Sequence, residues 1–103
     1  MLATVSAVER RSLRVHGVVQ GVGFRPFVHR LATSLGVGGS VGNDAAGVVI
    51  EVVGPAHVLD EFERRLVADA PRLAVVVGVD VLGVAGVADV AGGFRIVPSG
   101  GGG

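Results

Sequence analysis

The chain contains no cysteine, tryptophan, tyrosine or lysine among its 103 residues. Without cysteine it can form neither a disulfide nor a thiolate metal site, so we expect a reducing compartment, the cytoplasm. Without lysine it cannot carry the phosphate-binding loop of the P-loop nucleoside triphosphatases, because that motif requires one. The glycine spacing also differs from the dinucleotide-binding fingerprint.

Charge is scarce and balanced. Nine basic residues, all of them arginine, stand against nine acidic ones, and the formal net charge at pH 7 is zero. Only 4% of the residues are aromatic, so the chain has neither the basic surface nor the stacking side chains of nucleic-acid-binding domains. No apolar run is long and uncharged enough to span a membrane, and the first nine residues do not resemble a secretory signal. We therefore expect neither a nucleic-acid nor a membrane partner.

What the chain does have is apolar residues (50%) in patterns with clear periods. Leu13 and Val15 alternate with polar neighbours, which is typical of a half-buried strand. Helical spacing of apolar residues predicts a helix from Pro26 to Leu35, with Pro26 in its first turn and Gly36 ending it. A second helix is predicted from Pro55 to about Ala70, with surface pairs Asp60–Arg64 and Glu61–Arg65. The predicted strands are 12–18, 38–43, 48–53, 74–82 and 94–97, with a turn at 44–47 and a loop at 84–93.

This order predicts an α+β fold of the ferredoxin-like type, a βαββαβ sandwich with two helices on one face of an antiparallel sheet of four or five strands. A helical crossover makes the first two strands parallel, and the third strand lies between them. Their carboxyl ends then share one edge of the sheet. Since neighbouring strands are about 4.8 Å apart, the loop 18–24 and Asn43 should lie about 10 Å apart.

The stretch HGVVQGVGFRPF, His16 to Phe27, places Gly21 and Gly23 directly before a helix and Arg25. Glycines allow the backbone to turn several N–H groups toward one point, and the start of a helix adds positive potential there. An arginine fork binds phosphate with direction as well as charge. The stretch therefore predicts an oxyanion cradle. A tight strand-to-helix turn with a surface arginine remains an alternative.

Two segments resemble the motifs of the acylphosphatase family. GVVQGVGFR, Gly17 to Arg25, resembles its signature, and GSVGN, Gly39 to Asn43, followed by Gly47, resembles its second motif. The continuation FRPFVHRLA, together with FRIVPS near the end, is similar to the N-terminal acylphosphatase-like domain of the HypF carbamoyltransferases of hydrogenase maturation. The resemblance covers about residues 11–98.

This resemblance implies hydrolysis of acyl phosphates, with carbamoyl phosphate as the substrate in the HypF setting. Arg25 corresponds to the phosphate-binding arginine, and Asn43 to the asparagine that positions the attacking water. No metal or other cofactor is implied. The implied partners are downstream domains of a larger chain and hydrogenase maturation proteins. The cradle would be completed by the backbone amides of Gln20, Gly21, Val22, Gly23 and Phe24.

Two other functions stay open, a free-standing acylphosphatase with broad substrates and a non-catalytic phosphate-binding domain. Ser40 and Gly42 depart from the second motif, where relatives commonly carry tryptophan and a basic residue. Asp44 is interpreted as a turn former, because a carboxylate in the pocket would repel phosphate. We interpret Arg14 and His16 as surface residues. The expected organisation is an N-terminal extension at 1–10, the acylphosphatase-like domain at 11–98 and a glycine-rich tail at 99–103.

Overall fold

The computed structural model describes residues 8–87 and 92–97, so the expected tail and the first seven residues lie outside it. None of the described helices is long and apolar enough to cross a membrane. The elements follow in the order β1 (Val8–Val18), α1 (Phe24–Leu35), β2 (Gly38–Asp44), β3 (Gly47–Pro55), α2 (Ala56–Ala68), β4 (Val75–Gly86) and β5 (Phe94–Ile96).

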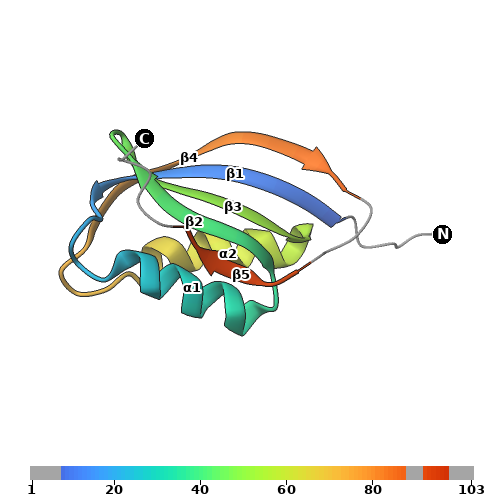
Figure 1. Cartoon of the computed structure of the whole chain (residues 1–103), viewed down its shortest axis with the longest axis horizontal. Helices are drawn as coiled ribbons and strands as arrows, with labels where there is room; N and C mark the ends of the chain where they lie inside the picture. Colours follow the sequence, from blue (N-terminus) through green and yellow to red (C-terminus); the bar gives the residue numbers. More distant parts are fainter. Residues whose placement is uncertain (1–7, 88–91, 98–103) are drawn as a thin grey trace.

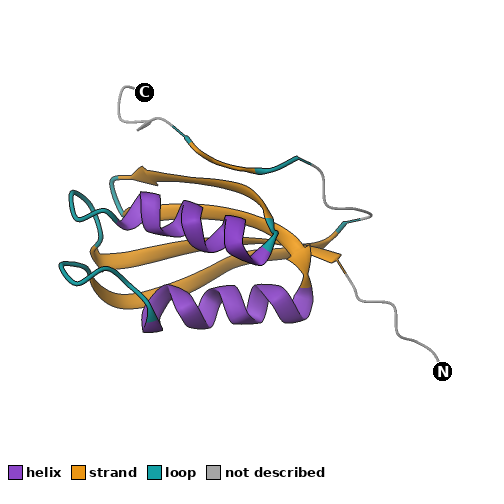
Figure 2. Ribbon diagram, turned by 90° about the horizontal axis from the view of Figure 1, so that it is seen from below, coloured by secondary structure: helices purple, strands orange, loops and turns teal. Residues whose placement is uncertain are grey.

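The five strands form one sheet in the order β4-β1-β3-β2-β5. β3 pairs antiparallel with both β1 and β2, so β1 and β2 run in the same direction. Both helices cover the same face of the sheet (Figures 1 and 2). The ferredoxin-like arrangement, including the place of the third strand between the first two, is therefore confirmed.

The sheet is mixed and not wholly antiparallel, because the edge strand β5 pairs in parallel with β2. β4 and β5 are the two edge strands, so these two consecutive strands lie at opposite edges of the sheet. The sequence pattern of a short strand does not reveal whether it will pair in parallel or antiparallel, because that depends on where the preceding connection places the strand in the sheet. The loop expected from Val84 was also wrong at its start, because β4 continues to Gly86.

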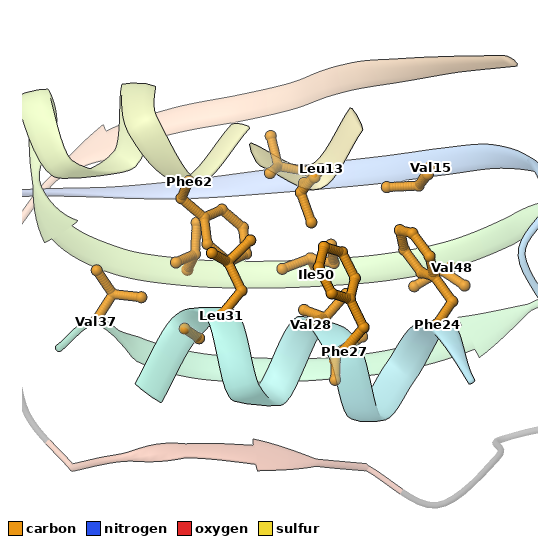
Figure 3. Close-up of a cluster of buried hydrophobic side chains, with 14 of the residues drawn as sticks. Leu13, Val15, Phe24, Phe27, Val28, Leu31, Val37, Val48, Ile50 and Phe62 are labelled. Atoms are coloured by element: carbon orange, nitrogen blue, oxygen red, sulfur yellow. The ribbon is translucent and has the colours of Figure 1, made fainter. Parts of the chain in front are cut away.

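The core lies between the sheet and the two helices (Figure 3). Leu13 and Val15 of β1 are fully buried, as the alternation predicted, and Phe62 of α2 packs from the opposite side. Burying side chains of this size contributes about 1.5–3 kcal/mol each. The buried apolar side chains that hold α1 and α2 to the sheet are Phe24, Phe27, Val28, Leu31, Ala32, Leu59, Phe62 and Leu66.

Helix α1 begins at Phe24, two residues before the predicted start at Pro26. Gly23 caps it with a left-handed backbone, φ 79°. Phe24 is only 1% exposed, so its burial extends the apolar stripe by one turn. The prediction was wrong because it took the proline for the first helical position. As a result, Arg25 lies within the first turn of the helix and not in the loop before it.

The surface pairs of α2 were predicted in part. Arg65 lies 4.0 Å from Glu61, as expected, and 2.9 Å from Asp69. The pair Asp60–Arg64 was wrong, because Arg64 binds Glu61 at 2.7 Å and Asp60 accepts a hydrogen bond from Arg11 of β1.

Arg11 ties α2 to β1. Its guanidinium donates to Glu9, Asp60 and Glu63 at 3.0, 2.9 and 2.8 Å. Burial opposes its charge, but the hydrogen bonds to Glu63, Asp60 and Glu9 outweigh that cost and raise the pKa of Arg11 above its ordinary value. Arg11 thus forms ion pairs with three carboxylates at once. Asp60 is one of them, so its carboxylate lies toward β1 and not toward Arg64.

Gly47, the first residue of β3, permits the close approach of the β2–β3 turn to β1. Its φ is 148°, and a Cβ there would meet the carbonyl oxygen of Val15 and lie 3.7 Å from Cγ of Arg14. We expect Gly47→Ala to lower the free energy of unfolding by about 3 kcal/mol, because a backbone clash adds to left-handed strain. Urea denaturation measures the change.

Gly83→Ala in β4 is the matched control, since a Cβ there meets nothing within 4 Å. It should change stability by less than about 1 kcal/mol. Equal effects of the two substitutions would contradict the close approach at Gly47.

Candidate active site

The loop after β1 turns through two left-handed glycines. Gly21 has φ 73° and Gly23 has φ 79°, and a Cβ at either position would meet no atom within 4 Å. Space is therefore not the reason for glycine at these positions; the backbone conformation is. It carries the chain from the sheet edge directly into α1.

The backbone N–H groups of this loop find no acceptor among the described residues. Within residues 8–87 and 92–97, no protein acceptor receives a hydrogen bond from the backbone N–H of residues 20 to 24. Helix α1 has no side-chain cap and no acidic residue in its first turn. Unpaired donors at a helix start carry a partial positive charge and favour an anion. Among the described residues, these donors are therefore available to an anion at the position where the sequence predicts the cradle.

Arg25 lies in the first turn of α1 and is half-buried. No carboxylate in the described part of the chain lies within ion-pair distance of its guanidinium. Position on the helix brings it to the same end of the molecule as the loop. Its charge is available to an anionic ligand at that end.

Asn43 lies at the carboxyl end of β2, at the sheet edge where β1 also ends (Figure 1). It pairs with Val48 of β3, which pairs with Val15 of β1. Side chains alternate along a strand, so Asn43 shares the helix-covered face with the buried Val41. Its Oδ1 is buried and accepts no hydrogen bond from the described residues. A buried acceptor of this kind calls for a water or ligand partner.

Asp44 forms the turn that the sequence predicted. Its Oδ1 accepts hydrogen bonds from the backbone N–H groups of Ala46 and Gly47 at 2.9 and 3.1 Å. Its Oδ2 accepts one from Nη2 of Arg14 at 2.9 Å. The Arg14 guanidinium, and then the Ala46 N–H, hold the pKa of Asp44 below its ordinary value. These contacts therefore stabilise the fold above the ordinary aspartate pKa and are lost only as pH falls through the lower folded-state value.

Two side chains near the site were missed from the sequence, where Arg14 was interpreted as a surface residue and Gln20 only as a backbone donor. Arg14 binds Asp44, and Nε2 of Gln20 donates to the backbone carbonyl of Asp44 at 3.3 Å. Partners separated by 30 and 24 residues leave no mark in local periodicity.

The described surface has several concavities, of which two bear on the site. One, of about 470 Å³, borders the glycine loop and is lined by Val22, Pro71, Arg72 and Leu73. A larger one, of about 610 Å³, runs from Arg10 on β1 to β5 and includes none of the expected site residues. The described residues contain no group of three or more side chains suited to hold a metal ion.

The fold and the sheet edge at which the two loops meet are those of small α+β domains of the acylphosphatase class. The acylphosphatase family model matches residues 11–96, and the chain belongs to the acylphosphatase family. Within that family it is similar to the carbamoyltransferases called HypF. It is 62% identical over 65 residues to HypF2 of Cupriavidus necator, a match covering 63% of this chain and 8% of that protein.

Stand-alone relatives match as well. The chain is 49% identical over 70 residues to an acylphosphatase of Thermotoga maritima, covering 67% of this chain and 77% of that protein. Among solved structures, full-length HypF in the phosphate- and nucleotide-bound form has a TM-score of 0.79 at 32% identity, covering 97% of this chain and 13% of that one. Acylphosphatase from Bacillus subtilis has a TM-score of 0.70 at 30% identity, covering 87% and 98%. The chain spans only 8 to 11% of the length of the HypF relatives of Cupriavidus, Rhizobium and Rhodobacter.

Inorganic phosphate should stabilise the domain through the loop and Arg25. At a concentration of 100 times Kd the gain is about 2.7 kcal/mol, which raises the Tm of a domain of this size by at least about 10 °C. Arg25→Gln should remove most of the shift, because the fork and its charge are lost. Differential scanning calorimetry, with chloride at equal ionic strength as the reference, measures it.

Arg64→Gln on the outer face of α2 is the matched control and should keep the full shift. A shift of equal size in Arg25→Gln would place the phosphate away from Arg25.

Proposed function

We propose that this chain hydrolyses acyl phosphates to a carboxylate and inorganic phosphate. Its substrate would be carbamoyl phosphate, as the first domain of a cytoplasmic HypF-type carbamoyltransferase in [NiFe]-hydrogenase maturation. The observation that carries the proposal is that hydrogen-bond donors and an acceptor, none of them with a partner among the described residues, lie close together in the fold. The loop amides and Oδ1 of Asn43, which have no hydrogen-bond partner within residues 8–87 and 92–97, lie with the Arg25 guanidinium at the same end of the sheet.

The chemistry needs little more than these groups. The amides and Arg25 hold the phosphoryl oxygens and stabilise their charge, and Oδ1 of Asn43 accepts a hydrogen bond from the attacking water. The water oxygen bonds to phosphorus, the bond from phosphorus to the acyl oxygen breaks, and its electron pair leaves with the carboxylate. Both water protons end on the phosphate product. A carboxylic acid has a pKa of about 4, so the leaving group requires no general acid.

Catalysis of this kind rests on positioning and charge stabilisation. Asn43 is neutral, so it can hold water without repelling the phosphoryl group. The partners proposed for the domain are the small-molecule acyl phosphate, further domains of a longer chain and hydrogenase maturation proteins. The similarity to HypF supports this setting, because those relatives are carbamoyltransferases.

The test is phosphate release from benzoyl phosphate and carbamoyl phosphate by the purified domain. Arg25→Gln and Asn43→Ala should each lower kcat/KM by about 10²–10³-fold, the usual loss for one preorganised group. Arg64→Gln is the control and should retain the wild-type rate. Unchanged release in both site variants would refute the assignment.

A domain that binds phosphate in the calorimetric experiment but releases none from either substrate would be a non-catalytic phosphate-binding domain.

A second candidate is a free-standing acylphosphatase with broad substrates. The coverage of 77% of the Thermotoga enzyme favours it, and so does the concavity beside Val22, which offers room for a larger acyl group. A kcat/KM for benzoyl phosphate well above that for carbamoyl phosphate would support this candidate. Cys-x-x-Cys pairs encoded soon after Ser99 would support the carbamoyltransferase instead.

A further inference from the structure

One hydrogen bond joins the two loops of the candidate site. Nε2 of Gln20, in the loop after β1, donates to the backbone carbonyl of Asp44 at 3.3 Å. β3 lies between β1 and β2, so the sheet ladder does not connect these two loops directly. The Gln20 side chain therefore spans the end of β3 and reaches the residue that follows Asn43.

Arg14 holds the same residue by its side chain. Nη2 of Arg14 donates to Oδ2 of Asp44 at 2.9 Å, while Oδ1 of Asp44 is occupied by the backbone N–H groups of Ala46 and Gly47. Arg14 and Gln20 belong to one continuous segment of β1 and its loop, and both end on Asp44. The turn is thus held at its carbonyl and at its carboxylate from the phosphate-loop side.

The contact of Arg14 with Asp44 also affects the electrostatics of the site. A free carboxylate next to a phosphate pocket would repel the substrate. Arg14 lies on the strand face opposite to Leu13 and Val15, which are buried under the helices. It therefore holds the Asp44 carboxylate on the helix-free side, whereas Asn43 points to the helix-covered side. A guanidinium on Oδ2 offsets the negative charge at that point.

We infer that Arg14 and Gln20 are positioning residues, which hold the Asp44 turn so that the Asn43 carboxamide is fixed relative to the phosphate loop. The inference rests on the proposed function for its catalytic consequence. Its physical basis is that a misplacement of about 1 Å in a reacting group can cost about 10²-fold in rate. We call the two contacts of Arg14 and Gln20 with Asp44 the Asp44 clamp. The phosphate cradle itself lies in the loop and α1, so it should bind phosphate without this clamp.

The kinetic test uses Gln20→Ala and Arg14→Met with benzoyl phosphate as substrate and inorganic phosphate as the binding probe. We expect kcat to fall by about 10-fold or more in each, with the Kd of phosphate changed by less than about threefold, since the amides and Arg25 are untouched. Arg14→Lys should recover part of the rate, because it keeps a cationic donor. Arg14→Met combined with Asp44→Asn should cost no more than the larger single effect, since both remove one contact.

Arg10→Met is the matched control. Arg10 lies on the same strand and the same helix-free face as Arg14, without a hydrogen bond or ion pair to another residue of the described part of the chain. Its kcat should equal that of the wild type. Unchanged kcat in Gln20→Ala and Arg14→Met would overturn the inference. So would a parallel loss of kcat, phosphate binding and Tm, because that marks a merely structural effect.

A second readout separates this inference from the proposed function. In ¹⁵N relaxation measurements on the wild type, the Asn43 side-chain NH₂ should be as rigid as the backbone, and Gln20→Ala should make it mobile. This measurement needs no hydrolysis. If the wild type releases no phosphate, the proposed function fails, yet the clamp still stands or falls by the rigidity of that group. An Asn43 carboxamide equally rigid in wild type and Gln20→Ala would overturn the clamp.

Discussion

The structure depends on the placement of β3 between β1 and β2. Because β3 is antiparallel to both, β1 and β2 run in the same direction, and their carboxyl ends lie at the same end of the sheet. The glycine loop leaves the sheet there and Asn43 ends β2 there, although 20 residues separate Gly23 from Asn43 in the sequence. Two glycines make this packing possible, Gly39 against Glu51 of β3 and Gly47 against Val15 of β1. A side chain at either position would force the strands apart.

The candidate site follows from what this edge leaves unpaired. In the part of the chain that the structure describes, the helix start has no side-chain cap, the loop amides have no acceptor and Arg25 has no carboxylate partner, and all three features favour an anion. The carboxylate next to Asn43 in the sequence, that of Asp44, is already bound by Arg14. At this end of the sheet, the positive charge of Arg25 is therefore available to a ligand, whereas the negative charge of Asp44 is offset by Arg14. The chain as a whole has no net charge, so this local separation arises from the fold.

Sequence reasoning succeeded where a local period reflects burial. The alternation at Leu13 and Val15 and the helical stripe through Phe27, Val28 and Leu31 predicted the elements and the faces that the structure buries. It failed where local preference competed with tertiary contacts. Pro26 suited a helix start, but burial of Phe24 moved the start earlier. Asp60 suited Arg64 by spacing, but in the structure it accepts a hydrogen bond from Arg11 on the sheet.

The sequence by itself determined the glycine loop before an arginine, the order of helices and strands, and hence the ferredoxin-like fold, because each of these rests on residues within one turn or one strand of each other. The tertiary structure alone decided the parallel pairing of β5 with β2 and the contacts of Arg14 and Gln20 with Asp44. It also decided that Oδ1 of Asn43 is buried with no hydrogen-bond partner among the described residues. These contacts join residues that are far apart in the chain. Their energies depend on distances and orientations that exist only once the sheet has assembled.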